Sequence, residues 1–381
     1  KVSCTQENLN KGLNIVSHVS NKNTNLPILN NVLLQTTNKV LKLCATNLEI
    51  GVTHLARCKI TEDGEIATEA KILADYINLL PKNNVEIETN ENNLLISCGN
   101  HKTQINGNQT EDFPLIPTME KEKGYKIRLV DFKEALSQTI FAASFNDLRQ
   151  EISGAFFNFS NGKMTIVATD SYRLAEKIID FKPINQDDCE RSMILPLRTI
   201  QEILRILNLN EDVLNDGDNN VDVDLYVDDN QILMSSNNTE LISKLVEGQY
   251  PDYKQIIPQD PKTNIIINKN ELQKAVKAAS LFTKAGIYDV ELKVSVKNNE
   301  LEIFSENSQL GRNSIKISAQ VSGEDNGIVL NFRYFLDGLQ NINTDQVSID
   351  IIDMATPCLA RSYKDEKVDQ NYLYLIMPIR Q

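Results

Sequence analysis

The sequence lacks several patterns that would decide the class of the protein directly. No apolar run approaches the 18 or so residues that a membrane-spanning helix needs. The start, KVSCTQENLN, has none of the basic, apolar and small-residue blocks of a signal peptide. The six cysteines never form a C-x-x-C pair. We therefore expect a cytoplasmic protein whose cysteines are reduced and act mostly as small buried hydrophobes.

Motifs of common enzyme classes are also missing. The only histidines are His18, His54 and His101, all in the first third of the chain, which disfavours a histidine-rich metal site and a catalytic triad. Neither a G-x-x-x-x-G-K-[ST] phosphate loop nor a G-x-G-x-x-G fingerprint occurs. We expect a protein that is not an enzyme and needs no cofactor or metal.

An acidic run over 210–229 is the one feature that suggests metal chemistry. As an EF-hand it fails, because Leu214 and Val223 fall at positions that need oxygen ligands. The run is better explained as a polar turn between a helix and a strand. A metal-dependent hydrolase that uses Asp222, Asp224 and Asp228 is kept as a remote alternative.

The chain is long enough for two or three domains, since 381 residues divide into three of about 127. Its 41% hydrophobic and 24% charged residues are typical of a globular protein. Three similar stretches support a threefold division: CATNLEIGV at 44–52, VATDSYRLA at 167–175 and IFSENSQLG at 303–311. Each predicts an apolar strand, a polar turn and a second strand.

Two features repeat at one offset. Thr46 and Thr169 of these hairpins lie 123 residues apart, and so do Leu9 and Phe132, which begin apolar helical patterns. A second helix begins near Lys71, Arg198 and Arg333, with the third, seventh and tenth residues apolar each time. Alternating runs between the helices predict half-buried strands.

Proline-containing segments at 113–124 and 250–264 mark the joints between the repeats. The fold class is therefore α+β, with three repeated domains, each of two helices packed on antiparallel sheets. We expect the domains to span 1–122, 125–257 and 262–381.

Charge is segregated along the sequence. The net charge is −13, yet the six expected helical segments with their flanks together carry +8, which leaves −21 on the remainder. Cations near helix N-termini oppose the helix dipole, so Lys71, Arg198 and Arg333 indicate contact with phosphates.

The ordered combination of VATDSYRLA, LPILNNVLLQ (26–35), SKLVEGQYPDY (243–253) and LIMPIRQ (375–381) resembles the bacterial DNA polymerase III beta subunit family, the sliding clamps. The resemblance covers the whole chain. It implies a homodimer of two crescents that forms a six-domain ring around duplex DNA. Such a ring slides without sequence specificity and keeps the polymerase on its template as a processivity factor.

The resemblance also implies a hydrophobic pocket for short peptides of the DNA polymerase III alpha subunit, the clamp loader, other polymerases and repair proteins. These peptides supply apolar side chains and a Gln, and no membrane partner is expected. By position, the pocket residues are Ile152, Thr169, Ser171, Tyr172, Arg173, Leu174, Pro251, Gln255, Ile256, Cys358, Leu375, Met377, Pro378, Ile379 and Arg380. Tyr172 stands where many relatives have His, and Gln255 where some have Arg.

Two further sets follow from the resemblance. The DNA-binding residues implied are Lys22, Asn23, Lys71, Asn146, Arg149 and Arg198. The dimer interface implied consists of Lys102, Thr103, Ile105, Leu281 and Phe282. A multi-domain interaction scaffold that keeps the fold without encircling DNA is the nearer alternative, and it need not be a dimer.

Overall fold

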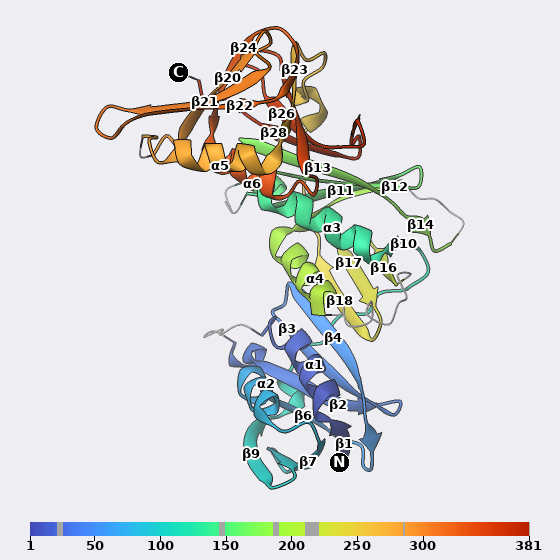
Figure 1. Cartoon of the computed structure of the whole chain (residues 1–381). Coiled ribbons are helices and arrows are strands. Elements are labelled where there is room, and N and C mark those ends of the chain that lie inside the picture. The colour runs from blue at the N-terminus through green and yellow to red at the C-terminus, as the bar shows by residue number, and fades with distance from the viewer. Residues whose placement is uncertain (21–25, 145–148, 186–189, 210–220, 285, 381) are drawn as a thin grey trace. The chain divides into compact units, whose positions relative to one another are not determined.

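The structure is a computed structural model that describes residues 1–381 except 21–25, 145–148, 186–189, 210–220, 285 and 381. Its helices and strands follow one another in the same order three times (Figure 1). Each repeat has a leading strand, a helix, three long strands, a short strand, a fourth strand, a second helix and a final set of strands. The α+β class and the threefold repetition predicted from the sequence are confirmed.

Within the described residues, the α-helices and strands of the three repeats correspond one to one, except that the third repeat has an additional short strand, β27. Repeat one comprises β1 (Val2–Thr5), α1 (Gln6–Val16), β2 (Asn31–Thr37), β3 (Val40–Thr46), β4 (Ile50–Arg57), β5 (Lys59–Ile60), β6 (Glu65–Glu69), α2 (Ala70–Leu79), β7 (Asn84–Asn90), β8 (Asn93–Cys98) and β9 (His101–Asn108). Repeat two comprises β10 (Gly124–Arg128), α3 (Leu129–Thr139), β11 (Gly154–Ser160), β12 (Lys163–Thr169), β13 (Arg173–Asp180), β14 (Lys182–Pro183), β15 (Arg191–Pro196), α4 (Leu197–Leu209), β16 (Asp222–Val227), β17 (Gln231–Ser236) and β18 (Thr239–Lys244). Repeat three comprises β19 (Thr263–Asn268), α5 (Lys269–Ser280), β20 (Asp289–Ser295), β21 (Glu300–Asn307), β22 (Gly311–Ser318), β23 (Gln320–Gly323), β24 (Asn326–Asn331), α6 (Phe332–Gln340), β25 (Gln346–Ile351), β26 (Cys358–Lys364), β27 (Lys367–Val368) and β28 (Tyr372–Ile376).

The second helices α2, α4 and α6 each begin one residue before the basic residue that the sequence indicated. The apolar spacing explains them, because Leu73 and Ile77 of α2 and Phe335 and Leu339 of α6 are buried. Helix α6 is capped by Asn331, whose side chain accepts a hydrogen bond from the backbone N–H of Arg333 at 2.9 Å.

The charge segregation predicted from the sequence is weaker in the structure. Within their observed bounds, the six described helices carry nine basic and seven acidic side chains, a net +2 rather than +8. Part of the difference comes from flanking residues that lie outside the helices and have acidic neighbours, whereas Lys22 and Asp147 lie outside the described residues. Lys1 pairs with Glu88 at 2.9 Å, and Lys126 lies 3.9 Å from Asp224. That expectation was therefore wrong in extent, because the assumed helical segments were too long.

The three similar stretches do form hairpins, and an Asn or Asp side chain closes each turn. Asn47 Oδ1 accepts from the backbone N–H groups of the residues two and three positions later, at 3.0 and 2.7 Å. Asp170 does the same at 2.9 and 3.0 Å, and Asn307 at 2.9 and 3.3 Å. This is an Asx turn, which offers the backbone a local partner where the strand ladder stops.

The chain divides into two compact units, of which the first contains 1–130, 181–188 and 198–245. All strands of this unit form one sheet in the order β14-β10-β16-β17-β18-β4-β3-β2-β6-β9-β8-β7-β1-β5. Strand β4 pairs with β18, so repeats one and two share a continuous ladder. Helix α1 packs closely on this sheet because Gly12 has no side chain; a Cβ there would lie 2.7 Å from the His54 ring.

The second unit contains 131–180, 189–197 and 246–381. Its larger sheet has the order β15-β11-β12-β13-β28-β26-β25-β19-β23, and its smaller sheet the order β22-β21-β20-β24. Here β13 pairs with β28, so repeats two and three also share a ladder. Helix α6 approaches β28 at Gly338, where a Cβ would lie 2.1 Å from the Tyr374 ring.

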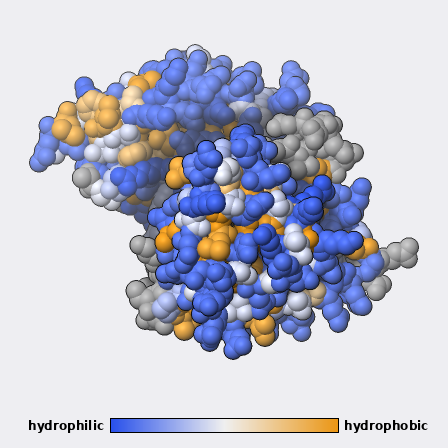
Figure 2. All heavy atoms as spheres, turned by 90° about the horizontal axis from the view of Figure 1, so that it is seen from below, coloured by the Kyte–Doolittle hydropathy of each residue, from blue (hydrophilic) through white to orange (hydrophobic). Residues whose placement is uncertain are grey.

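On the face shown in Figure 2, hydrophilic residues cover most of the visible surface, with smaller apolar patches between them. Within the described residues, no helix has both the length and the apolar character needed to cross a membrane.

Candidate functional site

The residues of the predicted peptide pocket lie where repeats two and three join in the second unit. Leu174 of β13 pairs with Leu375 of β28, and Leu375 also pairs with Leu359 of β26. Because side chains alternate along a strand, Leu174 and Leu375 share one face of this sheet with Leu373 and Met377. Three antiparallel strands thus present a continuous apolar floor.

This floor is part of one hydrophobic cluster. Its buried members include Ile152, Leu174 and Leu375, and Met377 packs against it half-buried. Four predicted pocket residues are thereby brought together from segments that lie more than 200 residues apart in the sequence. A short peptide segment could extend this apolar surface.

Exposed residues border the cluster. Tyr172 is 63% exposed and Ile256 43% exposed, although both are large and apolar or aromatic. Tyr172 stacks loosely on Tyr334 of α6, with ring centroids 6.4 Å apart. Pro251 and Gln255 are exposed, and Gln255 Nε2 donates to Asp252 Oδ2 at 2.8 Å. Exposed apolar side chains beside a buried cluster are typical of a binding surface.

The segment after β28 continues along this border. The backbone N–H of Met377 donates to the carbonyl of Tyr172 at 2.8 Å, and that of Ile379 donates to the carbonyl of Val329, also at 2.8 Å. Pro378 and Ile379 are half-buried and Arg380 is exposed. Backbone hydrogen bonds therefore hold this segment beside the hairpin turn of repeat two.

The structure gives Arg173 a different role from its neighbour Leu174, because the two lie on opposite faces of β13. The Arg173 guanidinium donates to Asp170 Oδ2 at 3.0 Å and to Asp337 Oδ2 at 2.6 Å. It also lies over the Tyr334 ring, 4.6 Å from the centroid. Burial opposes its charge, but Tyr374 and these carboxylates outweigh burial and raise the pKa of Arg173 further. Arg173 thus ties repeat two to repeat three.

Cys358 does not lie on the pocket face. It is completely buried, and its neighbour Leu359 is the residue that joins the cluster. The alternation of side chains along β26 explains this correction. Burial also raises the pKa of the Cys358 thiol, as expected for an inert core cysteine.

Ser171 and Thr169 shape the turn itself. Thr169 Oγ1 donates to the Arg173 carbonyl at 2.6 Å and accepts from the Ser171 N–H at 3.1 Å. Ser171 has a φ of 77°, a conformation that few non-glycine residues adopt. The turn thus presents Tyr172 outward.

Sequence reasoning missed several residues of this region. Tyr250 and Tyr253 are buried in the cluster, and Tyr334 and Asp337 hold Arg173. The two tyrosines flank Pro251 in GQYPDY, a visible signal, since paired aromatics around a proline are typical of a packed turn. Tyr334 and Asp337 could not have been found, because a partner far away in the sequence needs the fold.

The predicted DNA-binding residues are scattered between the two units. Lys71 and Arg198 are exposed in the first turns of α2 and α4. Arg149 is exposed and its Nη1 donates to Ser171 Oγ at 3.2 Å, which places it beside the pocket turn. Lys22, Asn23 and Asn146 lie outside the described residues.

The predicted dimer residues occupy two different elements. Lys102, Thr103 and Ile105 lie on β9, next to a groove of about 370 Å³ between β9 and α2. Leu281 follows α5 and is 70% exposed, and Phe282 is half-buried.

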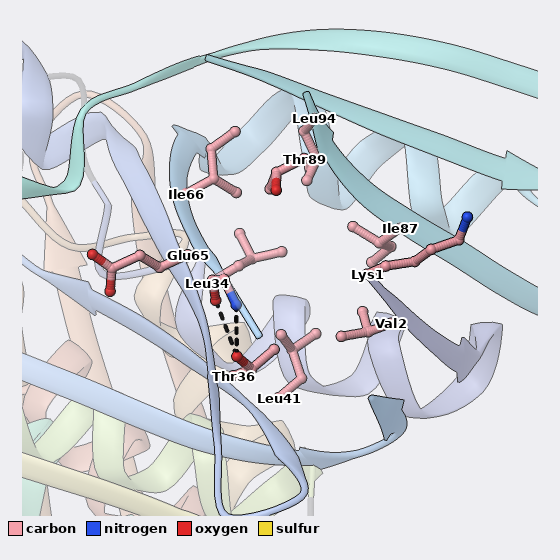
Figure 3. A pocket seen from close by; sticks show the side chains of 11 residues that line it. Lys1, Val2, Leu34, Thr36, Leu41, Glu65, Ile66, Ile87, Thr89 and Leu94 are labelled. Carbon is pink, nitrogen blue, oxygen red and sulfur yellow. Dashed lines mark hydrogen bonds between the residues drawn. The ribbon is translucent and has the colours of Figure 1, made fainter. Parts of the chain in front are cut away.

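A small cavity inside repeat one is not a binding site for a peptide. A cavity of about 30 Å³ inside repeat one is walled by Val2, Leu34 and Leu41 among others, and Thr36 closes one side (Figure 3). It holds about one water molecule and no peptide. Among the described residues, no group of three His, Cys, Asp or Glu side chains is placed to hold a metal ion. The hydrolase alternative gains no support.

A clamp built from three repeated α+β domains is the class of protein that this fold defines. Three family models match in order: the N-terminal domain of the DNA polymerase III beta subunit over 1–117, its central domain over 126–252 and its C-terminal domain over 254–380. The chain belongs to the DNA polymerase III beta subunit family of bacterial sliding clamps.

Individual relatives agree along the whole chain. The beta sliding clamp of Staphylococcus aureus is 26% identical over 367 residues, covering 94% of this chain and 93% of the relative. A crystal structure of the DNA polymerase sliding clamp from Bacillus subtilis matches with a TM-score of 0.91 at 25% identity, covering 100% of this chain and 99% of that one. A putative beta subunit from Eubacterium rectale gives 0.88 at 29% identity, with the same coverage.

The chain is therefore a processivity factor of DNA polymerase III, and its family is non-catalytic. The predicted family, the predicted α+β fold and the predicted role as a non-catalytic processivity factor are confirmed. Membership of this family implies that its partners are DNA, a DNA polymerase and a second copy of the chain.

Proposed function

We propose that two copies of this cytoplasmic protein close head-to-tail into a ring that encircles duplex DNA. The three functional domains are 1–122, 125–257 and 262–381. The ring slides without reading sequence and tethers the polymerase alpha subunit, the clamp loader and other polymerases and repair proteins through the peptide pocket.

The pairing of the strands supports the ring. In repeats one and two, the third long strand pairs with the last strand of the following repeat: β4 with β18, and β13 with β28. In repeat three the equivalent strand is β22, whose outer edge is unpaired within the described residues. The last strand of repeat one is β9, which has an open edge over most of its length. The same rule therefore pairs β22 with β9 of a second chain and covers both edges.

The apolar side chains near these edges fit that arrangement. Leu281 and Phe282 of one chain would pack beside β9 of the other, where Thr103 and Ile105 border the 370 Å³ groove. Two such contacts close six repeats into a ring with closed twofold symmetry.

Contact with DNA rests on exposed cations and polar residues. Lys71 and Arg198 in helix first turns would contact phosphates, with Lys22, Asn23, Asn146 and Arg149 contributing. The small net charge of the helices suits sliding, because a few weak phosphate contacts are lost and regained easily.

The peptide pocket rests on the apolar floor of Leu174, Leu375 and Ile152 and on its exposed border at Tyr172 and Ile256. The remaining residues are Thr169, Ser171, Pro251, Gln255, Met377, Pro378, Ile379 and Arg380. Tyr172 keeps an aromatic wall with a polar tip.

Retention on DNA tests the ring. The purified protein should elute as a dimer, remain on nicked circular DNA after loading, and be lost when the circle is linearised. A monomer, or equal retention on linear DNA, would favour the scaffold that does not encircle DNA.

A truncation tests the pocket separately. Removing residues 377–381 should abolish binding of a polymerase peptide and leave the dimer intact. Unchanged peptide affinity would refute the pocket assignment without touching the ring.

A further inference from the structure

A second concavity lies in repeat two, beside the peptide pocket. It measures about 330 Å³ and is lined by β11, β12, β13 and the segment 250–254. We call it the flank groove. Of the residues predicted from the sequence for the pocket, only Pro251 lines it, and Tyr250 and Tyr253 connect it to the pocket cluster.

The flank groove continues the pocket along the same face of the sheet. On β13, Leu174 belongs to the pocket cluster, and Glu176 and Ile178, two and four residues later, line the groove. On β12, Thr169 borders the pocket and Thr165 lines the groove. Side chains two apart share a face, and four residues of strand span roughly 13 Å. A bound peptide could therefore reach from pocket to groove within about four residues.

The groove has an aromatic wall. Phe156 stacks on Tyr250, with ring centroids 5.1 Å apart and an interplanar angle of 18°. Tyr250 also belongs to the pocket cluster, so the wall is fixed by the same core. Such a surface accommodates the methylene stem of a long side chain.

The polar groups of the groove favour a cation. Glu176 Oε2 accepts a hydrogen bond from Tyr253 Oη at 2.5 Å, and within the described part of the chain no cation pairs with Glu176. Asp252 adds a second carboxylate and Lys254 one ammonium group, which leaves a net charge of −1. A carboxylate held by a tyrosine above an aromatic wall suits the head and stem of lysine or arginine.

We propose that the flank groove binds a lysine or arginine that lies within about four residues of the apolar core of a partner's clamp-binding peptide. This inference rests on the proposed peptide pocket and adds a specificity determinant to it. Partners would then differ in affinity through residues outside the core that all of them share.

Binding of synthetic peptides tests the proposal. Every peptide carries the same core of apolar residues and one Gln. In the reference peptide the four residues beyond each end of the core are Ala. In the test peptides a single Lys or a single Glu replaces one of these Ala residues at a time. At one end, the best Lys peptide should bind about threefold more tightly than the Ala peptide, and Glu should weaken binding by a similar factor, as expected for a partly exposed ion pair.

Variants assign the effect to the groove. Glu176→Gln keeps an acceptor for Tyr253 and should remove the Lys preference while the Ala peptide binds unchanged, which also shows that the variant is folded. Glu176→Lys should reverse the preference toward Glu. Glu134→Gln is the matched control, because Glu134 lies 4.0 Å from Lys177 on the opposite face of β13.

The outcomes are separable. Equal affinity for all flanks, a preference for Glu in the wild type, or a Lys preference that survives Glu176→Gln would overturn the flank groove and leave the pocket standing. Failure of every peptide to bind would overturn the pocket and the groove together.

Discussion

The joint between repeats one and two and the joint between repeats two and three have the same backbone and different side chains. Five residue pairs join β4 to β18, and five join β13 to β28. The turns before β4 and β13 match as well. Leu48 and Ser171 have φ values of 76° and 77°, and the backbone N–H of each donates to the hydroxyl of the Thr two residues earlier. The two joints therefore differ in the side chains of the five paired residues, 50–54 of β4 and 173–177 of β13, and in those of their partners.

The first and fifth positions illustrate the difference. Ile50 begins β4 and is buried, whereas Arg173 begins β13 and binds two carboxylates of two repeats. His54 at the fifth position of β4 is buried beside Thr239, whereas Lys177 lies over the Tyr372 ring. The repeated architecture thus fixes the pairing of strands, and single side chains give the two joints different surfaces.

The largest effect is expected at the proposed joint between β22 of one chain and β9 of a second chain. Leu281→Asp combined with Phe282→Asp places two charges where apolar surface must be buried, so the dimer should dissociate to monomers. Sedimentation or light scattering measures this. Leu115→Asp is the control, because Leu115 is 96% exposed and lies on no proposed interface. A stable dimer of the double variant would exclude the proposed interface.

Next in size is the loss of the cation that ties repeats two and three. Arg173→Met removes the cation from Asp170, which is mostly buried, and from Asp337, which is half exposed, and we expect the free energy of unfolding to fall by about 2 kcal/mol. Ile50→Met, the equivalent change in the first joint, swaps one apolar side chain for another and should cost about 1 kcal/mol. Urea unfolding of both variants measures the contrast, and equal losses would show that Arg173 contributes packing alone.

Acid should weaken the first joint selectively. Burial and, secondarily, Lys11 lower the pKa of His54 to about 4 from 6.5, so the unfolded chain takes up a proton first as pH falls. Neutral His54 costs the folded state nothing above pH 6.5. Between pH 6.5 and pH 4 the free energy of unfolding falls, and at pH 5 the loss is about 2 kcal/mol.

Hydrogen exchange of β4 and β18 amides across this pH range would detect the weakening locally. His54→Asn should flatten the profile of these strands and leave that of β13 and β28 unchanged. An unaltered profile in the variant would assign the acid sensitivity to other groups.

The smallest effect concerns the turns. Asn47→Ala removes two hydrogen bonds of the first turn and should cost about 1 kcal/mol. Asp170→Ala should cost about twice as much, because Asp170 also holds Arg173. Asp170→Asn keeps the hydrogen bonds of the turn but removes the charge. Its loss of stability in thermal unfolding should lie between those of Asn47→Ala and Asp170→Ala. An Asn variant as unstable as the Ala variant would show that the charge alone matters.

Much of the fold could be predicted from local patterns. The offset of 123 residues between Thr46 and Thr169 depends only on sequence, and the two turns do match in detail. Helix starts near Lys71, Arg198 and Arg333 were placed to within one residue, because apolar spacing is a local signal.

The rest depends on contacts that no local pattern records. Arg173 and Leu174 are neighbours in the sequence, yet strand alternation sends one to Asp337 and the other to the pocket cluster. Cys358 was assigned to the pocket by its position in the family resemblance, but Leu359 lies on the pocket face, because neighbouring residues of a strand point to opposite faces. The charge estimate failed for a related reason, since helix ends drawn too widely include strand residues.

The position of β28 has a consequence for synthesis of the chain on the ribosome. This strand lies in the middle of its sheet, between β13 and β26, but it is translated nearly 200 residues after β13. At roughly 5–20 residues per second, β13 waits some ten to forty seconds for its neighbour, with an open edge that other nascent chains could join. The sheet of the second unit therefore cannot be completed until the last strand of the chain has been synthesised.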